Sequence, residues 1–106
     1  MRNTMKKQRR VVVKVGTSTL TMENGALDLR TIDKLAQVLC AIHNEGNEVI
    51  LVSSGAIAVG VNKMHLPEKP KELRMKQAAA AVGQCELMHI YDKCFSEYGC
   101  MVAQIL

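Results

Sequence analysis

Apolar positions along the chain fall into two alternating patterns, short runs and stretches with helical spacing. The runs are Val11–Val15 and Val49–Val52, which are rich in β-branched residues and typical of strands inside a parallel sheet. The stretch between them has the period of an amphipathic helix, and its apolar members are Ile32, Leu35, Ala36, Leu39 and Ile42. The pattern therefore predicts a strand, a helix and a second strand.

Capping residues set the limits of this first long helix. Asp28 and Thr31 are both suitable N-caps. Gly46 follows the last periodic residue, and glycine readily adopts the left-handed conformation that ends a helix. Gly16–Thr21, by contrast, consists mostly of small and hydroxyl residues, so we expect it to be a loop.

Two more helices are predicted after the second strand. Ala56–Val61 reads as a short helix that ends near Gly60, and Lys71–Tyr98 reads as a long one. Gly83 lies inside the long helix, where glycine costs about 1 kcal/mol, so we expect another backbone to approach it closely. Met101–Leu106 is a candidate third strand. Strands that alternate with helices indicate an α/β fold with a mainly parallel sheet.

The net charge of +4 comes from one end of the chain. Five of the 14 basic residues lie in residues 1–10, which contain no acidic residue. We therefore separate a basic N-terminal tail, residues 1–10, from a near-neutral domain over residues 11–106. The domain lacks a basic face with interleaved aromatic residues, which argues against nucleic-acid binding. No apolar run is long enough for a signal peptide or a membrane span.

The four cysteines contain no CxxC pair, so zinc-binding spacing is absent. Reduced thiols packed as small apolar side chains are favoured over disulfides, and they indicate a cytoplasmic protein. The three histidines are not at metal-ligand spacing either, and no metal ligand is predicted within the chain.

Glycine and hydroxyl residues follow both predicted strands. Gly16, Thr17 and Ser18 come directly after the first strand, and Ser53–Gly55 follows the second. Ligands of parallel α/β sheets bind just beyond the carboxyl ends of strands, where glycine allows close approach and helix N-termini favour anions. Two such loops could hold two anionic ligands side by side, as a group transfer requires.

Lys14 is a charged residue inside the first apolar run. Alternation places Val13 and Val15 on one face of the strand and Lys14 on the other. Near the strand end its ammonium could reach a phosphate; the alternative is a lysine that extends to solvent from an edge strand. The stretch is neither a P-loop, in which lysine follows the glycines, nor a GxGxxG motif. The residues alone therefore indicate a phosphate- or carboxylate-binding α/β domain.

Three stretches taken together resemble the amino acid kinase family, and within it the branch that phosphorylates glutamate. They are VVVKVGTSTLT (11–21), ILVSSGAIAVG (50–60) and KQAAAAVGQ (76–84). The resemblance covers residues 11–106 and implies a three-layer sandwich around a mainly parallel sheet, here incomplete. It also implies ATP-dependent phosphorylation of the γ-carboxylate of L-glutamate to γ-glutamyl phosphate, the first step of proline biosynthesis. ATP and Mg²⁺ would be the cofactors, with Mg²⁺ carried mainly by the nucleotide.

The resemblance assigns one group of residues to ATP. Lys14 matches the family's catalytic lysine, which contacts the ATP phosphates. Gly16, Thr17 and Ser18 match the adjoining phosphate-binding loop.

The resemblance assigns a second group to glutamate. Ser54 matches the substrate-binding serine, and Gly55 and Ala56 belong to the same loop. Gln77 and Gln84 lie in the matching helix motif, but packing or solvent exposure is the favoured interpretation of both.

Further substrate- and ATP-binding residues of the family lie beyond the stretch that this chain matches. We therefore expect these 106 residues alone to be inactive. Alternatives are another amino acid kinase, acting on aspartate, carbamate or a nucleoside monophosphate, and a non-catalytic anion- or nucleotide-binding module. Family enzymes are commonly homo-oligomers, so the full-length parent is expected to be one as well.

Overall fold

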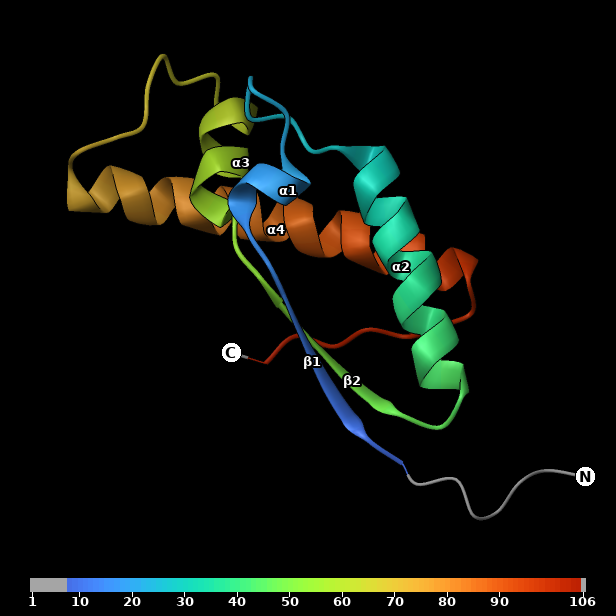
Figure 1. Cartoon of the computed structure of the whole chain (residues 1–106). Coiled ribbons are helices and arrows are strands. Elements are labelled where there is room, and N and C mark those ends of the chain that lie inside the picture. The colour runs from blue at the N-terminus through green and yellow to red at the C-terminus, as the bar shows by residue number, and fades with distance from the viewer. Residues whose placement is uncertain (1–7, 106) are drawn as a thin grey trace, which may run out of the picture.

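The computed structural model describes residues 8–105 of the chain and is an α/β structure (Figure 1). Its elements follow the order strand, two helices, strand, two helices. Their bounds are β1 Arg10–Val15, α1 Thr17–Leu20, α2 Leu29–Asn44, β2 Glu48–Ser53, α3 Ala56–Lys63 and α4 Leu73–Glu97. No helix among the described residues is long and apolar enough to cross a membrane.

The two strands form a parallel sheet, as the sequence predicts. The register runs from Arg10 opposite Glu48 to Val15 opposite Ser53. β1 begins one residue earlier than expected, because Arg10 pairs with Glu48 across the strands through an ion pair of 3.2 Å. Of the expected basic tail, residues 1–7 lie outside the described residues.

The sheet has one face packed against helices and one exposed face. Val15 is buried, and its neighbours on the same face are half-buried against the buried side chains of α2 and α4: Val13, Val49 and Leu51. The opposite face exposes Val12, Lys14, Ile50 and Val52. The predicted alternation along β1 is therefore confirmed, and the sandwich is incomplete as expected, because the described helices pack on one face only.

The bounds of α2 follow the predicted signals. Asp28 is its N-cap, and Oδ1 of Asp28 accepts a hydrogen bond of 3.3 Å from the backbone N–H of Thr31. Gly46 follows the helix with φ +97, in the left-handed region that glycine favours.

Helices α3 and α4 are in backbone contact at two glycines, and Figure 1 shows α3 lying against α4. A Cβ at Gly83 would stand 1.6 Å from the carbonyl oxygen of Ala56, and one at Gly60 would stand 1.7 Å from that of Ala79. The close approach expected at Gly83 is confirmed. The predicted helix end near Gly60 is wrong, because this glycine lies inside α3 and serves the crossing.

Two further predictions differ from the structure. Gly16–Thr21 is not wholly a loop: residues 17–20 form one helical turn, in which the N–H of Leu20 bonds to the C=O of Gly16 and the Leu20 side chain is fully buried. Met101–Ile105 is not a strand, because its backbone has no ladder partner among the described residues, although it borders a groove beside β2. Leu106 lies outside the described residues.

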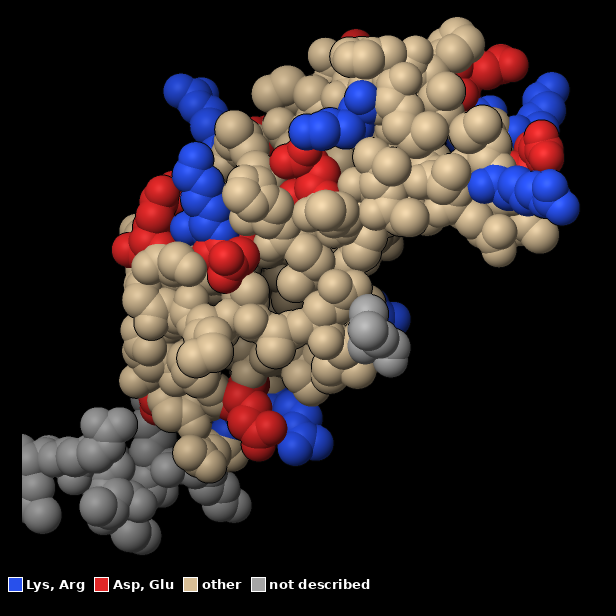
Figure 2. Space-filling model, turned by 180° about the vertical axis from the view of Figure 1, so that it is seen from behind, with Lys and Arg blue, Asp and Glu red and all other residues tan. Residues whose placement is uncertain are grey.

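Charged side chains are mixed on the surface. On the face shown in Figure 2, Lys and Arg lie close to Asp and Glu in several mixed groups, and a wide uncharged area separates these groups. This face is therefore not uniformly basic.

Candidate functional site

The loops that follow β1 and β2 meet at one edge of the sheet. The backbone N–H of Ser54 donates to the C=O of Val15 over 3.0 Å. A Cβ at Gly55 would stand 3.8 Å from three atoms of Thr17, which is van der Waals distance. The predicted proximity of the two strand-end loops is thus present, and it follows from the parallel register.

The first loop offers a cation, two hydroxyls and an unobstructed backbone. Lys14 is exposed on the open face of β1, opposite Val52. Gly16 precedes α1 with an ordinary extended conformation, φ −84 and ψ 165, and a Cβ there would meet no atom within 4 Å. Ser18 is exposed and Thr17 is half-buried. Nothing in the fold requires glycine at position 16, whereas a ligand close to the backbone would.

The second loop turns sharply into α3. Gly55 has φ +103, a left-handed conformation that favours glycine, and Ala56 begins the helix. The first N–H groups of a helix lack intrahelical partners and favour an anion. Ser54 is exposed beside them. Hydroxyl and amide donors at this point suit a carboxylate.

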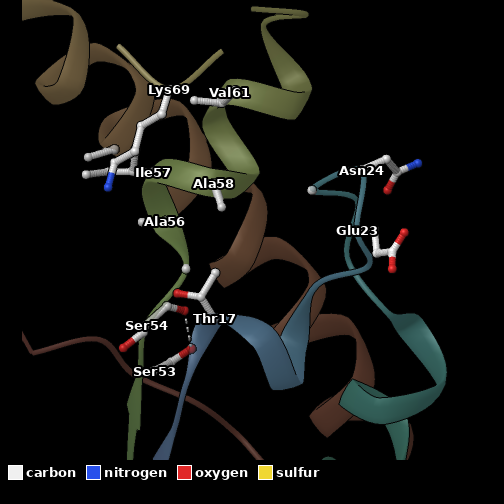
Figure 3. A pocket seen from close by; sticks show the side chains of 13 residues that line it. Thr17, Glu23, Asn24, Ser53, Ser54, Ala56, Ile57, Ala58, Val61 and Lys69 are labelled. Atoms are coloured by element: carbon white, nitrogen blue, oxygen red, sulfur yellow. Dashed lines mark hydrogen bonds between the residues drawn. The ribbon is translucent and has the colours of Figure 1, made fainter. Parts of the chain in front are cut away.

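An open cavity of about 630 Å³ lies over the two loops and α3 (Figure 3). Four of the predicted site residues line it: Thr17, Ser54, Gly55 and Ala56. The other three do not: Lys14, Gly16 and Ser18. Figure 3 shows Thr17, Ser53 and Ser54 together at one end of the cavity. The cavity is thus lined by one residue of the predicted ATP-binding loop and by all three residues of the predicted glutamate-binding loop.

The cavity also has walls that were not assigned from the sequence. Glu23, Asn24 and Gly25 line one side, and Lys69 lines another. The N–H of Ala26 donates to Oδ1 of Asn24, and Nδ2 of Asn62 in α3 donates to the C=O of Asn24, which holds this turn against α3. Asn-Gly is a local turn signal, but the contact of this turn with α3 spans 38 residues and leaves no local signal.

Gln77 and Gln84 lie outside this cavity. Gln77 is exposed on α4, and Gln84 is half-buried beside the groove that borders β2. Packing and solvent exposure, the favoured interpretations, match these positions.

A buried phenol lies behind the second loop. Burial raises the pKa of Tyr91 above its usual value. Oη of Tyr91 is 2.7 Å from Oγ of Ser53. The phenol is therefore neutral at physiological pH and remains able to donate a proton in a hydrogen bond.

The polar groups at the two strand ends suit anions better than metal ions. Among residues 8–105, no group of three or more His, Cys, Asp or Glu side chains could hold a metal ion. The groups at the strand ends are ammonium, hydroxyl and amide donors, which fit phosphate or carboxylate oxygens.

Comparisons with known proteins identify the family of this chain. The sequence model of the amino acid kinase family matches residues 9–106. The chain is 60% identical over 106 residues to "Glutamate 5-kinase" of Clostridium perfringens (strain 13 / Type A), covering all of this chain and 39% of the relative. It is 58% identical over 106 residues to "Glutamate 5-kinase" of Listeria monocytogenes serovar 1/2a, with 38% of the relative covered.

A third relative is "Glutamate 5-kinase" of Clostridium tetani, which is 57% identical over 102 residues, 96% of this chain and 38% of the relative. The chain thus spans about two fifths of the length of these curated relatives, as 39% and 38% coverage show. With a family match from residue 9 to residue 106, this chain belongs to the amino acid kinase family.

Proposed function

We propose that this chain is the N-terminal part of a kinase that transfers the γ-phosphoryl group of ATP to the γ-carboxylate of L-glutamate, forming γ-glutamyl phosphate for proline biosynthesis. The observation that carries the proposal is the 60% identity, over the whole chain, to a relative named "Glutamate 5-kinase". The meeting of two donor-rich loops at one sheet edge supports it, because phosphoryl transfer needs two anions held side by side.

The loop after β1 is proposed to bind the phosphates of ATP. Lys14 would place its positive charge against the transferring group, where negative charge builds in the transition state. Gly16 would let a phosphate approach the backbone, and the hydroxyls of Thr17 and Ser18 would donate to its oxygens. The open space at Gly16 and the exposure of Lys14 and Ser18 support these roles.

The loop after β2 is proposed to bind glutamate. The hydroxyl of Ser54 and the amides of Gly55 and Ala56 would donate to a carboxylate. This carboxylate oxygen would attack the γ-phosphorus, and the bond from that phosphorus to the bridging oxygen of ADP would break. No protein nucleophile takes part, so the protein's role is to hold both anions and offset their repulsion.

Mg²⁺ bound with the nucleotide would neutralise phosphate charge. The ammonium, hydroxyl and amide donors at the strand ends fit the phosphate oxygens around such an ion and not the ion itself.

Two further statements belong to the same proposal. Catalysis is proposed to need groups from the remainder of a complete kinase, because the chain spans only 39% of its relative. The complete kinase is proposed to be a homo-oligomer, as the family resemblance implies. A cytoplasmic location is proposed because the four cysteines are free thiols, of which Cys40 is buried, and reducing compartments preserve thiols.

The decisive experiment is a hybrid enzyme, in which this chain is joined to the C-terminal remainder of the Clostridium perfringens relative. Glutamate- and ATP-dependent acyl phosphate is measured as the hydroxamate. We expect Lys14→Ala to lower kcat at least about ten-fold and Ser54→Ala to raise the KM for glutamate about ten-fold, the effect of losing hydrogen bonds to charged groups. Lys34→Ala and Ser96→Ala, which change exposed residues on α2 and α4, are the matched controls.

The outcomes separate the rival functions. Activity with aspartate, carbamate or a nucleoside monophosphate in place of glutamate would assign another substrate of the family. Mg-ATP binding by isothermal titration, without any turnover, would indicate a binding module. Turnover of glutamate by the 106-residue chain alone would contradict the proposal that it needs a remainder.

A further inference from the structure

A chain of two hydrogen bonds links the interior of α4 to the second loop of the site. Oη of Tyr91 lies 2.7 Å from Oγ of Ser53, the last residue of β2. Oγ of Ser53 in turn donates to the backbone C=O of Ser54 over 3.2 Å, the bond drawn dashed in Figure 3. Tyr91 is 5% exposed, so its hydroxyl approaches the loop from the core side of the sheet.

The direction of both hydrogen bonds follows from the number of protons available. A serine hydroxyl has a single hydrogen, and that of Ser53 is directed to the C=O of Ser54. The hydroxyl of Tyr91 must therefore donate to Oγ of Ser53. Among the described residues no buried side-chain donor or acceptor lacks a partner, so this bond satisfies the phenol.

The chain of hydrogen bonds sets the direction of one backbone N–H group. The C=O of Ser54 and the N–H of Gly55 belong to one planar trans peptide and point in opposite directions. Holding the C=O against Ser53 on one side thus aims the N–H of Gly55 to the other side. No described residue accepts a hydrogen bond from this N–H, which leaves it available to a ligand.

The other end of Ser54 is held as well, because its own N–H donates to the C=O of Val15 over 3.0 Å. With both sides of the residue held, the peptide between Ser54 and Gly55 has one orientation. The left-handed φ of +103 at Gly55 depends on the same orientation.

We infer that Tyr91 is a positioning residue for the carboxylate-binding loop: through Ser53 it orients the Ser54–Gly55 peptide so that the N–H of Gly55 points at the bound substrate. The inference rests on the proposed function in taking the ligand of this loop to be a carboxylate. It adds a residue of α4, remote in sequence from both loops, to the groups that determine affinity for the phosphoryl acceptor.

The packing of Tyr91 allows a clean test. Its ring lies in the core beside Phe95, with ring centroids 6.2 Å apart, so a phenylalanine at position 91 would fill the same space. Tyr91→Phe therefore removes the hydroxyl and little else. Tyr98→Phe is the matched control, because the Tyr98 hydroxyl also forms hydrogen bonds, of 3.2 and 3.1 Å to Asp33, but near the end of α4 and away from the site.

Two readouts are measured in parallel. In the hybrid enzyme, Tyr91→Phe should raise the KM for glutamate about five-fold, the equivalent of one neutral hydrogen bond, and leave the KM for ATP unchanged. In the ¹⁵N-labelled 106-residue chain, it should shift the amide resonances of Gly55 and Ala56. Ser53→Ala should reproduce both effects. Ser53→Thr keeps a hydroxyl and should leave the KM for glutamate and the amide resonances close to those of the unsubstituted protein.

The inference and the proposed function fail in different ways. If the unsubstituted hybrid enzyme phosphorylates glutamate and Tyr91→Phe behaves like Tyr98→Phe in KM and amide shifts, the inference is overturned while the function stands. If the hybrid enzyme does not phosphorylate glutamate, the proposed function fails, and the amide shifts alone decide whether Tyr91 orients the loop. Equal rises in the KM for ATP and for glutamate would also overturn the inference, because they would show that Tyr91 has a general structural role.

Discussion

Gly83 of α4 lies directly against Ala56 of α3, so that a Cβ at position 83 would stand 1.6 Å from the Ala56 carbonyl oxygen. Ala56 is the first residue of α3 and follows the Ser54–Gly55 loop at once. Backbone contact at this point therefore sets the position of the candidate carboxylate-binding loop relative to α4.

Gly83→Ala is expected to lower the free energy of unfolding by about 2–3 kcal/mol, because the added methyl group must push two backbones apart. Helix propensity alone would predict the opposite sign, a gain of about 1 kcal/mol. Urea unfolding of the chain distinguishes the two. The control is Ala81→Gly, at an exposed position of α4, which should cost about 1 kcal/mol through propensity. A stabilised Gly83→Ala variant would contradict the observed crossing.

Asp28→Ala is expected to cost about 1 kcal/mol of stability, because Asp28 caps the N-terminus of α2. Asp28→Asn keeps the side-chain oxygen that accepts from the N–H of Thr31, and it should retain most of the stability. Thermal unfolding of the three proteins checks both statements. Equal losses in the two variants would show that the charge of Asp28, and not its cap, stabilises the helix.

The elements that could be predicted from sequence are those with a local cause. The two β-branched runs, the N-cap Asp28 and the left-handed Gly46 each carry their own signal, and the structure places strands and a helix at these positions. The meeting of the strand-end loops was also predictable, because parallel strands present their carboxyl ends at one edge.

The features that could not be predicted depend on distant contacts. Gly60 carries the local signal of a helix end, yet Ala79 of α4 lies against it and explains the glycine inside α3. Residues 101–105 are apolar enough for a strand, but strand formation needs a ladder partner, and none is present among the described residues. The hydrogen bond between Tyr91 and Ser53, 38 residues apart, leaves no mark on either local pattern.

Alkaline pH is expected to destabilise the chain through a buried thiol. Burial, with smaller contributions from Cys100, raises the pKa of Cys40 from 9.0 to about 12. Between these two pH values the unfolded chain has lost this proton and the folded chain retains it. The contribution of this thiol to the free energy of unfolding is therefore fully present below about pH 9. It falls by about 1.4 kcal/mol per pH unit as the pH rises towards 12.

Urea unfolding at pH 8 to pH 10.5 would measure this slope. Cys40→Ala should reduce the slope, whatever its effect on stability at pH 8, and Cys85→Ala, which removes an exposed thiol, is the control. The raised pKa of Tyr91 adds a contribution of the same sign at higher pH. An unchanged slope in Cys40→Ala would assign the alkaline loss to other groups.

Substitution by alanine should lower stability at Gly46 and weaken nucleotide binding at Gly16. Gly46 has φ +97, so Gly46→Ala forces a strained conformation and should cost about 1 kcal/mol or more of stability without any effect on nucleotide binding. Gly16 has φ −84 and open space where a Cβ would stand, so Gly16→Ala should change stability by less than about 0.5 kcal/mol.

If a phosphate of ATP approaches the backbone at position 16, the methyl group of Gly16→Ala would occupy part of its place. The KM for ATP of the hybrid enzyme should then rise about ten-fold, because hydrogen bonds to a charged group lengthen or break. The KM for glutamate should change little, since the Ser54–Gly55 loop is untouched. A Gly16→Ala enzyme with an unaltered KM for ATP would mean that the phosphates do not touch this loop, and Lys14 would then have to act without the backbone beside it.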